Sequence, residues 1–134
     1  MAHGSSIAES RGMSRDHRKL RVFHQADSLV IDIYKSTQHF PREETYGLQA
    51  QLRRAAVSTA ANIVEGSARR GEGEYLNFLN MAAGSATEVR YLIDLSQRLG
   101  FMTGPDAQCL EPRCAALIAG LIRLIDSLSH TVSL

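Results

Sequence analysis

The chain has 134 residues, of which 44% are hydrophobic and 22% are charged, and its formal net charge is +1. This size and composition are those of one soluble globular domain that can bury a core without disulfides or a metal ion. The lack of Trp and the presence of only four Phe and four Tyr argue against a β-sandwich and predict an aliphatic, Ala-rich helical core.

The first 16 residues are polar and rich in Gly and Ser, so we expect a disordered tail at 1–16 before a folded domain at 17–134. Met13 is an alternative translation start to Met1. The sequence has neither the apolar core of a signal peptide nor an apolar run of about 18 residues. We therefore expect a cytoplasmic protein with no membrane partner.

A first helix is predicted at about 20–37, where apolar residues recur at helical spacing. The residue before Pro41 is restricted to non-helical geometry, whereas a proline suits the first turn of a helix. The second helix is therefore predicted at about 41–68, with Glu43 and Glu44 in its first turn, where negative charge is favourable.

The third and fourth helices are predicted at about 72–100 and 106–131 from two further apolar stripes. Gly100 is expected to cap the third helix. Pro112 lies in the first two turns of the fourth helix and could mark a later start. Short connections between long amphipathic helices make neighbours antiparallel, so the predicted fold is all-α, an up-down-up-down four-helix bundle.

The second helix is apolar on two sides. One side, from Leu48 to Ile63, has the residues expected in a bundle core. With the second side, it forms an apolar belt about 200° wide, which is more than one core requires. We therefore expect the second side to be buried against another copy of the chain, with its arginine paired across the contact. The predicted interface residues are Arg53, Val57, Ala60 and Val64.

The remaining side of the second helix is polar and holds Arg54, Ser58, Asn62 and Glu65. Two interpretations are open. Short polar side chains within a helix usually have a local partner, so these residues can form a hydrogen-bonded ladder that fixes helix register. Alternatively, they form a ligand-binding surface.

Several short segments together resemble the signature of one bacterial family, the four-helix-bundle proteins encoded within intervening sequences of 23S ribosomal RNA genes, also called S23 ribosomal proteins. The matching segments are FP at 40–41, YGL at 46–48, QLRRAAVS at 51–58, NIVEG at 62–66, FL at 78–79, GS at 84–85, Glu88 and LG at 99–100. The resemblance covers about 20–130. The family often has Ile-Pro where this chain has Thr59-Ala60, so we do not expect the proline kink.

The resemblance implies a four-helix bundle in a homo-oligomer, with a pentamer as the expected form, because members of the family tend to form rings of five. A related group is similar: the accessory variability determinant proteins of diversity-generating retroelements form basic pentamers that bind nucleic acid beside a reverse transcriptase. RNA or DNA is thus an implied partner. The intervening-sequence proteins themselves have no established activity.

Catalytic and metal-binding patterns are not recognisable in the sequence. No Glu is followed three residues later by His, as di-iron bundles require, and the five His residues lack metal-ligand spacing. Cys109 and Cys114 would lie about 140° apart around a helix, so we expect two reduced thiols, with Cys114 in the core. We expect no enzyme activity, no catalytic or metal-binding residue, no cofactor and no small-molecule substrate.

Charge is unevenly distributed: residues 1–71 carry eleven Lys or Arg and seven Asp or Glu, whereas residues 72–134 carry four and seven. This basic half suggests non-specific binding to nucleic-acid phosphates, since few aromatic residues are present for base stacking. The candidate nucleic-acid-binding residues are Lys19, Arg21, Arg54, Arg69 and Arg70.

Other interpretations remain. Arg69 and Arg70 can simply be solvated cations at a helix C-terminus. The protein can also be a protein-interaction scaffold with no nucleic-acid role, or an enzyme whose site forms between subunits.

Overall fold

The computed structural model describes the backbone of residues 15–133 and the side chains of residues 15–129. It contains four α-helices and two short 3-10 turns, with no strand in this part of the chain. The elements are η1 (His17–Lys19), α2 (Arg21–Ser36), η2 (Arg42–Glu44), α3 (Leu48–Ser67), α4 (Glu72–Arg98) and α5 (Gly104–Ser133). The predicted disorder at 1–14 falls outside the described residues.

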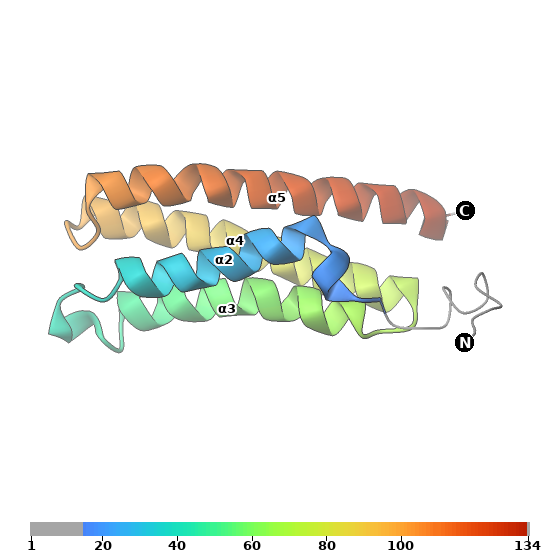
Figure 1. Cartoon of the computed structure of the whole chain (residues 1–134), viewed down its shortest axis with the longest axis horizontal. Coiled ribbons are helices and arrows are strands. Elements are labelled where there is room, and N and C mark those ends of the chain that lie inside the picture. The colour runs from blue at the N-terminus through green and yellow to red at the C-terminus, as the bar shows by residue number, and fades with distance from the viewer. Residues whose placement is uncertain (1–14, 134) are drawn as a thin grey trace.

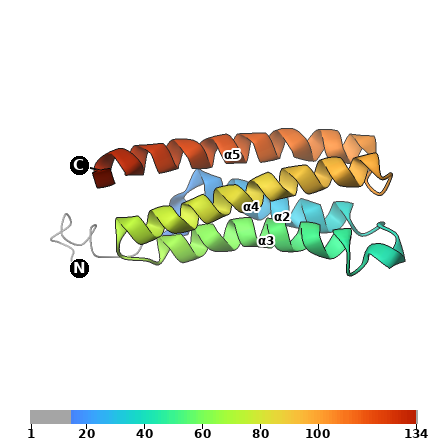
Figure 2. The ribbon, with the colours of Figure 1, turned by 180° about the vertical axis from the view of Figure 1, so that it is seen from behind.

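The four helices form an antiparallel bundle, as predicted (Figures 1 and 2). Each helix packs against the next along the chain, and α2 also packs against α5, which closes the bundle. None of the described helices is both long enough and apolar enough to cross a membrane.

The core is aliphatic and rich in Ala, as the composition predicted. Tyr75 is the largest fully buried side chain. The buried alanines are Ala26, Ala55, Ala56, Ala82, Ala86 and Ala107. Such small side chains let neighbouring helices approach closely, and this is most evident between α3 and α4.

α3 and α4 approach each other closely at Gly66. A Cβ atom at this position would lie 2.7 Å from the Cβ of Phe78 and 3.2 Å from Cδ1 of Tyr75. Atoms this close would overlap, so only glycine fits here without a shift of α4.

The predicted start of the second helix was wrong. Pro41 precedes the 3-10 turn η2, and α3 begins only at Leu48. The carboxylate of Glu44 still acts at a helix start, because its Oε1 accepts a hydrogen bond of 2.9 Å from the Leu48 backbone N–H. The glutamates therefore do indicate a helix start, but the helix begins at Leu48, four residues after Glu44, and not at Pro41.

Three other expectations concern where helices end and whether they run without a break. Gly100 follows α4 with a φ of 82°, as expected for a C-terminal glycine. The last helix begins at Gly104 and continues through Pro112, so this proline does not mark its start. α3 is helical throughout, and the buried Thr59 donates to the carbonyl of Ala55 at 2.9 Å.

Candidate nucleic-acid interface

Four of the five predicted cations lie at one end of the bundle. Lys19 ends η1 and Arg21 begins α2, while Arg69 and Arg70 follow α3. Because α2 and α3 are antiparallel, the start of one and the end of the other share an end of the molecule (Figure 1). All four side chains are exposed, and none forms an ion pair with another described residue. We call these four residues the basic end.

Two further arginines close to the basic end are neutralised by carboxylates. Arg18 Nε lies 3.0 Å from Asp16 Oδ1, and this hydrogen bond lowers the pKa of the Asp16 carboxyl. Arg15 Nη2 lies 3.2 Å from Glu72 Oε1. Glu74, exposed in the first turn of α4, adds negative charge nearby. The positive charge open to a partner is therefore that of the basic end.

Arg15 joins the start of the described chain to the α3–α4 turn. Its backbone N–H donates to the Ser67 carbonyl at 2.6 Å, and its Nη1 donates to the Arg69 carbonyl at 3.2 Å. Its guanidinium also stacks over the Tyr75 ring, 4.1 Å from the ring centroid. Residue 15 was included in the predicted tail, yet it contacts four residues of the bundle, with Glu72 as the fourth. These contacts hold the chain just before η1 on the α3–α4 turn, and η1 itself contacts α3.

Arg69 is more restrained than Arg70. Its guanidinium carbon lies 4.9 Å from the centroid of the Phe78 ring, which is a cation–π contact. Such stacking uses the face of the guanidinium and leaves its in-plane N–H groups free to meet phosphate oxygens.

Arg54 is separated from the basic end. It precedes Arg69 by 15 residues, which along a helix corresponds to roughly 20 Å. Its exposed side chain lines a groove on α3 that also includes Glu88 of α4. The structure thus places Arg54 in a different environment from the other four predicted residues.

Arg53, predicted to pair across a subunit contact, has partners within its own chain. Its Nε donates to Thr37 Oγ1 at 2.9 Å and its Nη2 donates to the Tyr34 carbonyl at 3.2 Å. The guanidinium stacks over the Tyr34 ring, 4.4 Å from its centroid. Arg53 therefore links α3 to α2 in a single protomer.

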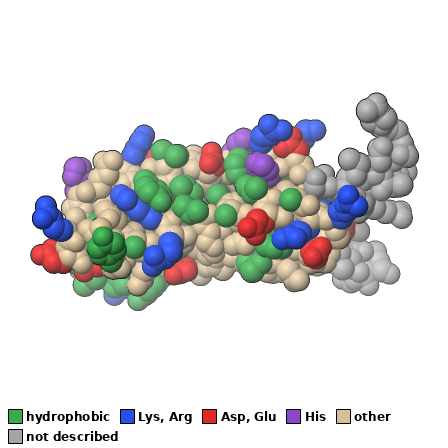
Figure 3. Space-filling model, turned by 90° about the horizontal axis from the view of Figure 1, so that it is seen from below, with side chains coloured by type: hydrophobic (Ala, Val, Ile, Leu, Met, Phe, Trp, Pro, Cys, Tyr) green, Lys and Arg blue, Asp and Glu red, His purple; other side chains and the backbone are tan. Residues whose placement is uncertain are grey.

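The other predicted interface residues are only partly exposed. Val57 is 42% exposed, whereas Ala60 and Val64 are half-buried and Ala60 packs against the core. Intrachain packing thus accounts for part of the wide apolar belt. Ile31 and Tyr34 of α2 are also exposed, at 53% and 42%. Figure 3, viewed from the α3 side, shows hydrophobic side chains gathered on this face.

The polar side of α3 contains a hydrogen-bonded ladder. The hydroxyls of Ser58 and Ser85 lie 2.9 Å apart, which joins α3 to α4. Asn62 Nδ2 donates to the Ser58 carbonyl at 2.9 Å and to its hydroxyl at 3.1 Å. These contacts match the register-fixing interpretation for Ser58 and Asn62. Arg54 and Glu65 are exposed, and neither forms an ion pair with a described residue.

The cysteines are arranged as predicted, with Cys109 exposed and Cys114 buried. Burial raises the pKa of the Cys114 thiol to about 11. Within the described residues, no group of three His, Cys, Asp or Glu is placed to hold a metal ion.

Sequence reasoning missed the contacts of Arg15, Tyr34 and Thr37. Arg15 stood in a polar segment without apolar periodicity, and nothing local indicated its contacts with residues more than 50 positions away. Tyr34 lies within the first predicted helix, and nothing in the sequence indicated a contact with Arg53. Its carbonyl and its ring meet Arg53 only after α2 and α3 have packed together.

Comparison with known proteins places this chain in a family. The model of the family "23S rRNA-intervening sequence protein" matches residues 18–123. A crystal structure of a protein of unknown function from the S23 ribosomal protein family of Bacteroides thetaiotaomicron has the same fold, with a TM-score of 0.72 and 22% sequence identity over 78% of this chain and 95% of that chain. No curated protein matches. The chain therefore belongs to the 23S rRNA-intervening sequence protein family.

Proposed function

We propose that this protein is a non-enzymatic bundle that binds the phosphate backbone of RNA or DNA through its basic end. The observation that supports this is the convergence of four exposed cations from two helix termini, none of which is paired with a described acidic residue. Guanidinium and ammonium groups recognise phosphates whatever the base sequence, so binding is expected to be non-specific.

We further infer that copies of the chain associate. The exposed apolar side chains Ile31, Tyr34 and Val57 on neighbouring helices support this inference. The resemblance to ring-forming proteins favours a pentamer. A ring would repeat the basic end in every copy, so that weak phosphate contacts add up along one nucleic acid.

The test is fluorescence anisotropy of labelled structured RNA and duplex DNA, titrated with protein at about 50 and 200 mM salt. Binding through phosphates should weaken steeply as salt rises, because each neutralised phosphate releases counterions. The double variant Arg69→Ala/Arg70→Ala should bind more weakly to all sequences and lower the salt slope by about 2.

A matched control is Lys35→Ala/Arg42→Ala. It removes the same charge from exposed residues where α2 ends and η2 begins, at the opposite end of the bundle. This variant should bind like the parent protein. If both double variants weaken binding equally, net charge rather than the basic end is responsible. If neither RNA nor DNA binds at about 50 mM salt, a protein-interaction scaffold becomes the better interpretation.

A further inference from the structure

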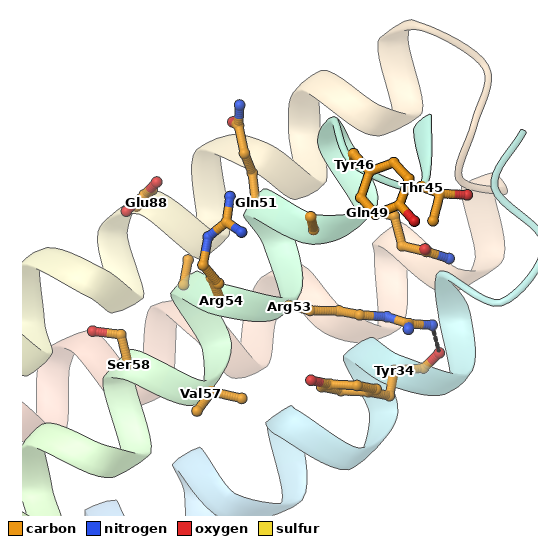
Figure 4. Close-up of a pocket in the computed structure, with 12 residues that line it drawn as sticks. Tyr34, Thr45, Tyr46, Gln49, Gln51, Arg53, Arg54, Val57, Ser58 and Glu88 are labelled. Carbon is orange, nitrogen blue, oxygen red and sulfur yellow. Dashed lines mark hydrogen bonds between the residues drawn. The ribbon is translucent and has the colours of Figure 1, made fainter. Parts of the chain in front are cut away.

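A groove of about 780 Å³ runs along the first half of α3, between α2 and the segment that precedes α3. Tyr34 of α2, Tyr46 of the preceding segment, and Arg53 and Val57 of α3 line it (Figure 4). The tyrosines are 42% and 94% exposed. The groove therefore combines aromatic and aliphatic side chains with two guanidinium groups and several uncharged polar side chains, and ligand sites commonly join apolar walls to a few polar groups.

The guanidinium in this groove is held in one orientation. Thr37, which accepts the Arg53 Nε–H, is fully buried and donates its own hydroxyl hydrogen to the Ile33 carbonyl at 2.8 Å. Gln49 Nε2 donates to the Thr37 carbonyl at 2.8 Å, which fixes the same residue from the α3 side. Together with the Tyr34 ring beneath it, this network prevents Arg53 from swinging into solvent.

Arg53 retains unused hydrogen-bonding capacity and an unneutralised charge. A guanidinium has five N–H donors, and the bonds to Thr37 and Tyr34 occupy only the Nε–Nη2 edge. The edge between Nη1 and Nη2 makes no hydrogen bond to a described residue. Arg53 also has no ion pair among the described residues, although it is half-buried. The one acidic residue lining the groove, Glu88, lies on the Arg54 side in Figure 4.

We propose that this groove binds the carboxylate of a small organic acid with an aromatic or aliphatic body. The free Nη1–Nη2 edge of Arg53 donates two parallel hydrogen bonds to the two carboxylate oxygens. Tyr46, Val57 and Ala50 cover the apolar part of the ligand. This inference does not depend on nucleic-acid binding, because Arg53 is not part of the basic end. The ligand would compete with a second copy of the chain for Tyr34 and Val57, which also belong to the face proposed to join copies.

The lining favours a carboxylate over a phosphate or a nucleic acid. A phosphate dianion is normally held by several cations or backbone N–H groups. Here only one of the two guanidiniums that line the groove, that of Arg53, is held in place, whereas Arg54 is exposed and lies on the side of Glu88. A planar monoanion therefore matches this edge better than a tetrahedral dianion.

The experiment is a calorimetric titration of the full chain with phenylacetate, with phenylacetamide and inorganic phosphate as comparison ligands. Phenylacetate should bind, and both comparison ligands should bind at least about tenfold more weakly. Arg53→Gln should weaken phenylacetate binding about tenfold or more. The matched variant Arg123→Gln removes the same charge from an exposed residue of α5 that does not line the groove, and it should change the affinity less than about twofold.

Several outcomes would overturn the proposal. Equal binding of the amide would show an apolar groove without a carboxylate site, and equal binding of phosphate would show a general anion site. An apparent affinity that falls as protein concentration rises would show that a second copy occupies the groove. Circular dichroism of Arg53→Gln controls for folding. If that variant is unfolded, Tyr46→Ala, at a 94% exposed side chain, must still weaken phenylacetate binding for the proposal to stand.

Discussion

Arg53 and Arg54 are adjacent in the sequence, but their side chains have different surroundings. Arg54 is exposed, whereas Arg53 reaches across to α2 and bonds to Thr37. The helical wheel of the second helix separated the two arginines correctly. It could not identify Thr37 or Tyr34 as partners, because those residues belong to another helix and meet Arg53 only through tertiary packing.

The Thr37 hydroxyl is expected to contribute measurably to stability. Replacing Thr37 with Val removes the acceptor of the Arg53 Nε–H and leaves that donor half-buried. We expect the free energy of unfolding to fall by about 1–3 kcal/mol. Chemical denaturation followed by circular dichroism measures this loss.

Thr87→Val is the matched control. The Thr87 hydroxyl also donates to the carbonyl four residues earlier, that of Ala83, at 2.8 Å. Thr87 is exposed, however, and its hydroxyl accepts no hydrogen bond from an arginine in the described part of the chain. We expect a change within about 0.5 kcal/mol. Equal losses at Thr37 and Thr87 would show that the bond to Arg53 contributes nothing.

The two cysteines should react at different rates. Burial raises the pKa of Cys114 to about 11, so almost none of it is thiolate at pH 8, whereas Cys109 is exposed. Alkylation of the native protein at pH 8, followed by mass spectrometry, should modify Cys109 first. Cys114 should react only in denaturant, or faster as the pH is raised toward 11. Rapid double modification of native protein at pH 8 would contradict the buried position of Cys114.

At the scale of helices, the sequence predicted which helices exist and in what order more accurately than it predicted where each helix begins and ends. Helical apolar spacing and glycines located all four helices and the end of α4. The start of α3 was missed because Pro41, Glu43 and Glu44 also suit a helix N-terminus. Which of two adjacent turns begins the helix depends on the hydrogen bond from Leu48 to Glu44 and on packing, and neither is visible in a single sequence.

The contact of α3 with α4 should be sensitive to one added methyl group at Gly66. The new Cβ would lie 2.7 Å from the Cβ of Phe78 unless α4 moved away. We expect Gly66→Ala to lower the free energy of unfolding by about 1–3 kcal/mol. Thermal or urea denaturation measures the effect.

Gly84→Ala, in the middle of α4, provides the comparison. A Cβ there has no atom within 4 Å beyond its own helix and chain neighbours. This substitution should stabilise the protein by about 0.4–1 kcal/mol, because it reduces the entropy of the unfolded chain without strain. A gain at both positions would mean that α3 and α4 can separate slightly without loss of packing.

At the scale of the whole molecule, the sequence indicated a basic half but not which of its cations are free to meet a partner. The predicted antiparallel order already implied that Lys19 and Arg70 share an end of the bundle. The sequence could not show that Asp16 and Glu72 neutralise Arg18 and Arg15. The charge count alone therefore overstated the cations that are available to a partner.

The proposed association predicts a mass well above that of one chain, 14.7 kDa, in light scattering. Val57→Asp should shift the protein toward the monomer, because it places a charge on the exposed apolar face. Met81→Asp is the control, since Met81 of α4 is exposed to a similar degree, 48% against 42%. A parent protein that runs as a stable monomer would refute association, and a dimer would refute only the number five.

The anchoring of Arg15 on the α3–α4 turn also bears on where a tag, a fusion partner or a dye can be joined to the protein. Arg15 lies at the basic end, and the last turns of α5 lie at the same end of the bundle (Figure 1). A purification tag or fusion partner joined after α5 would therefore crowd the surface proposed to meet nucleic acid. Cys109, near the start of α5, faces solvent at the far end. A dye or surface linker coupled there would leave the basic end open.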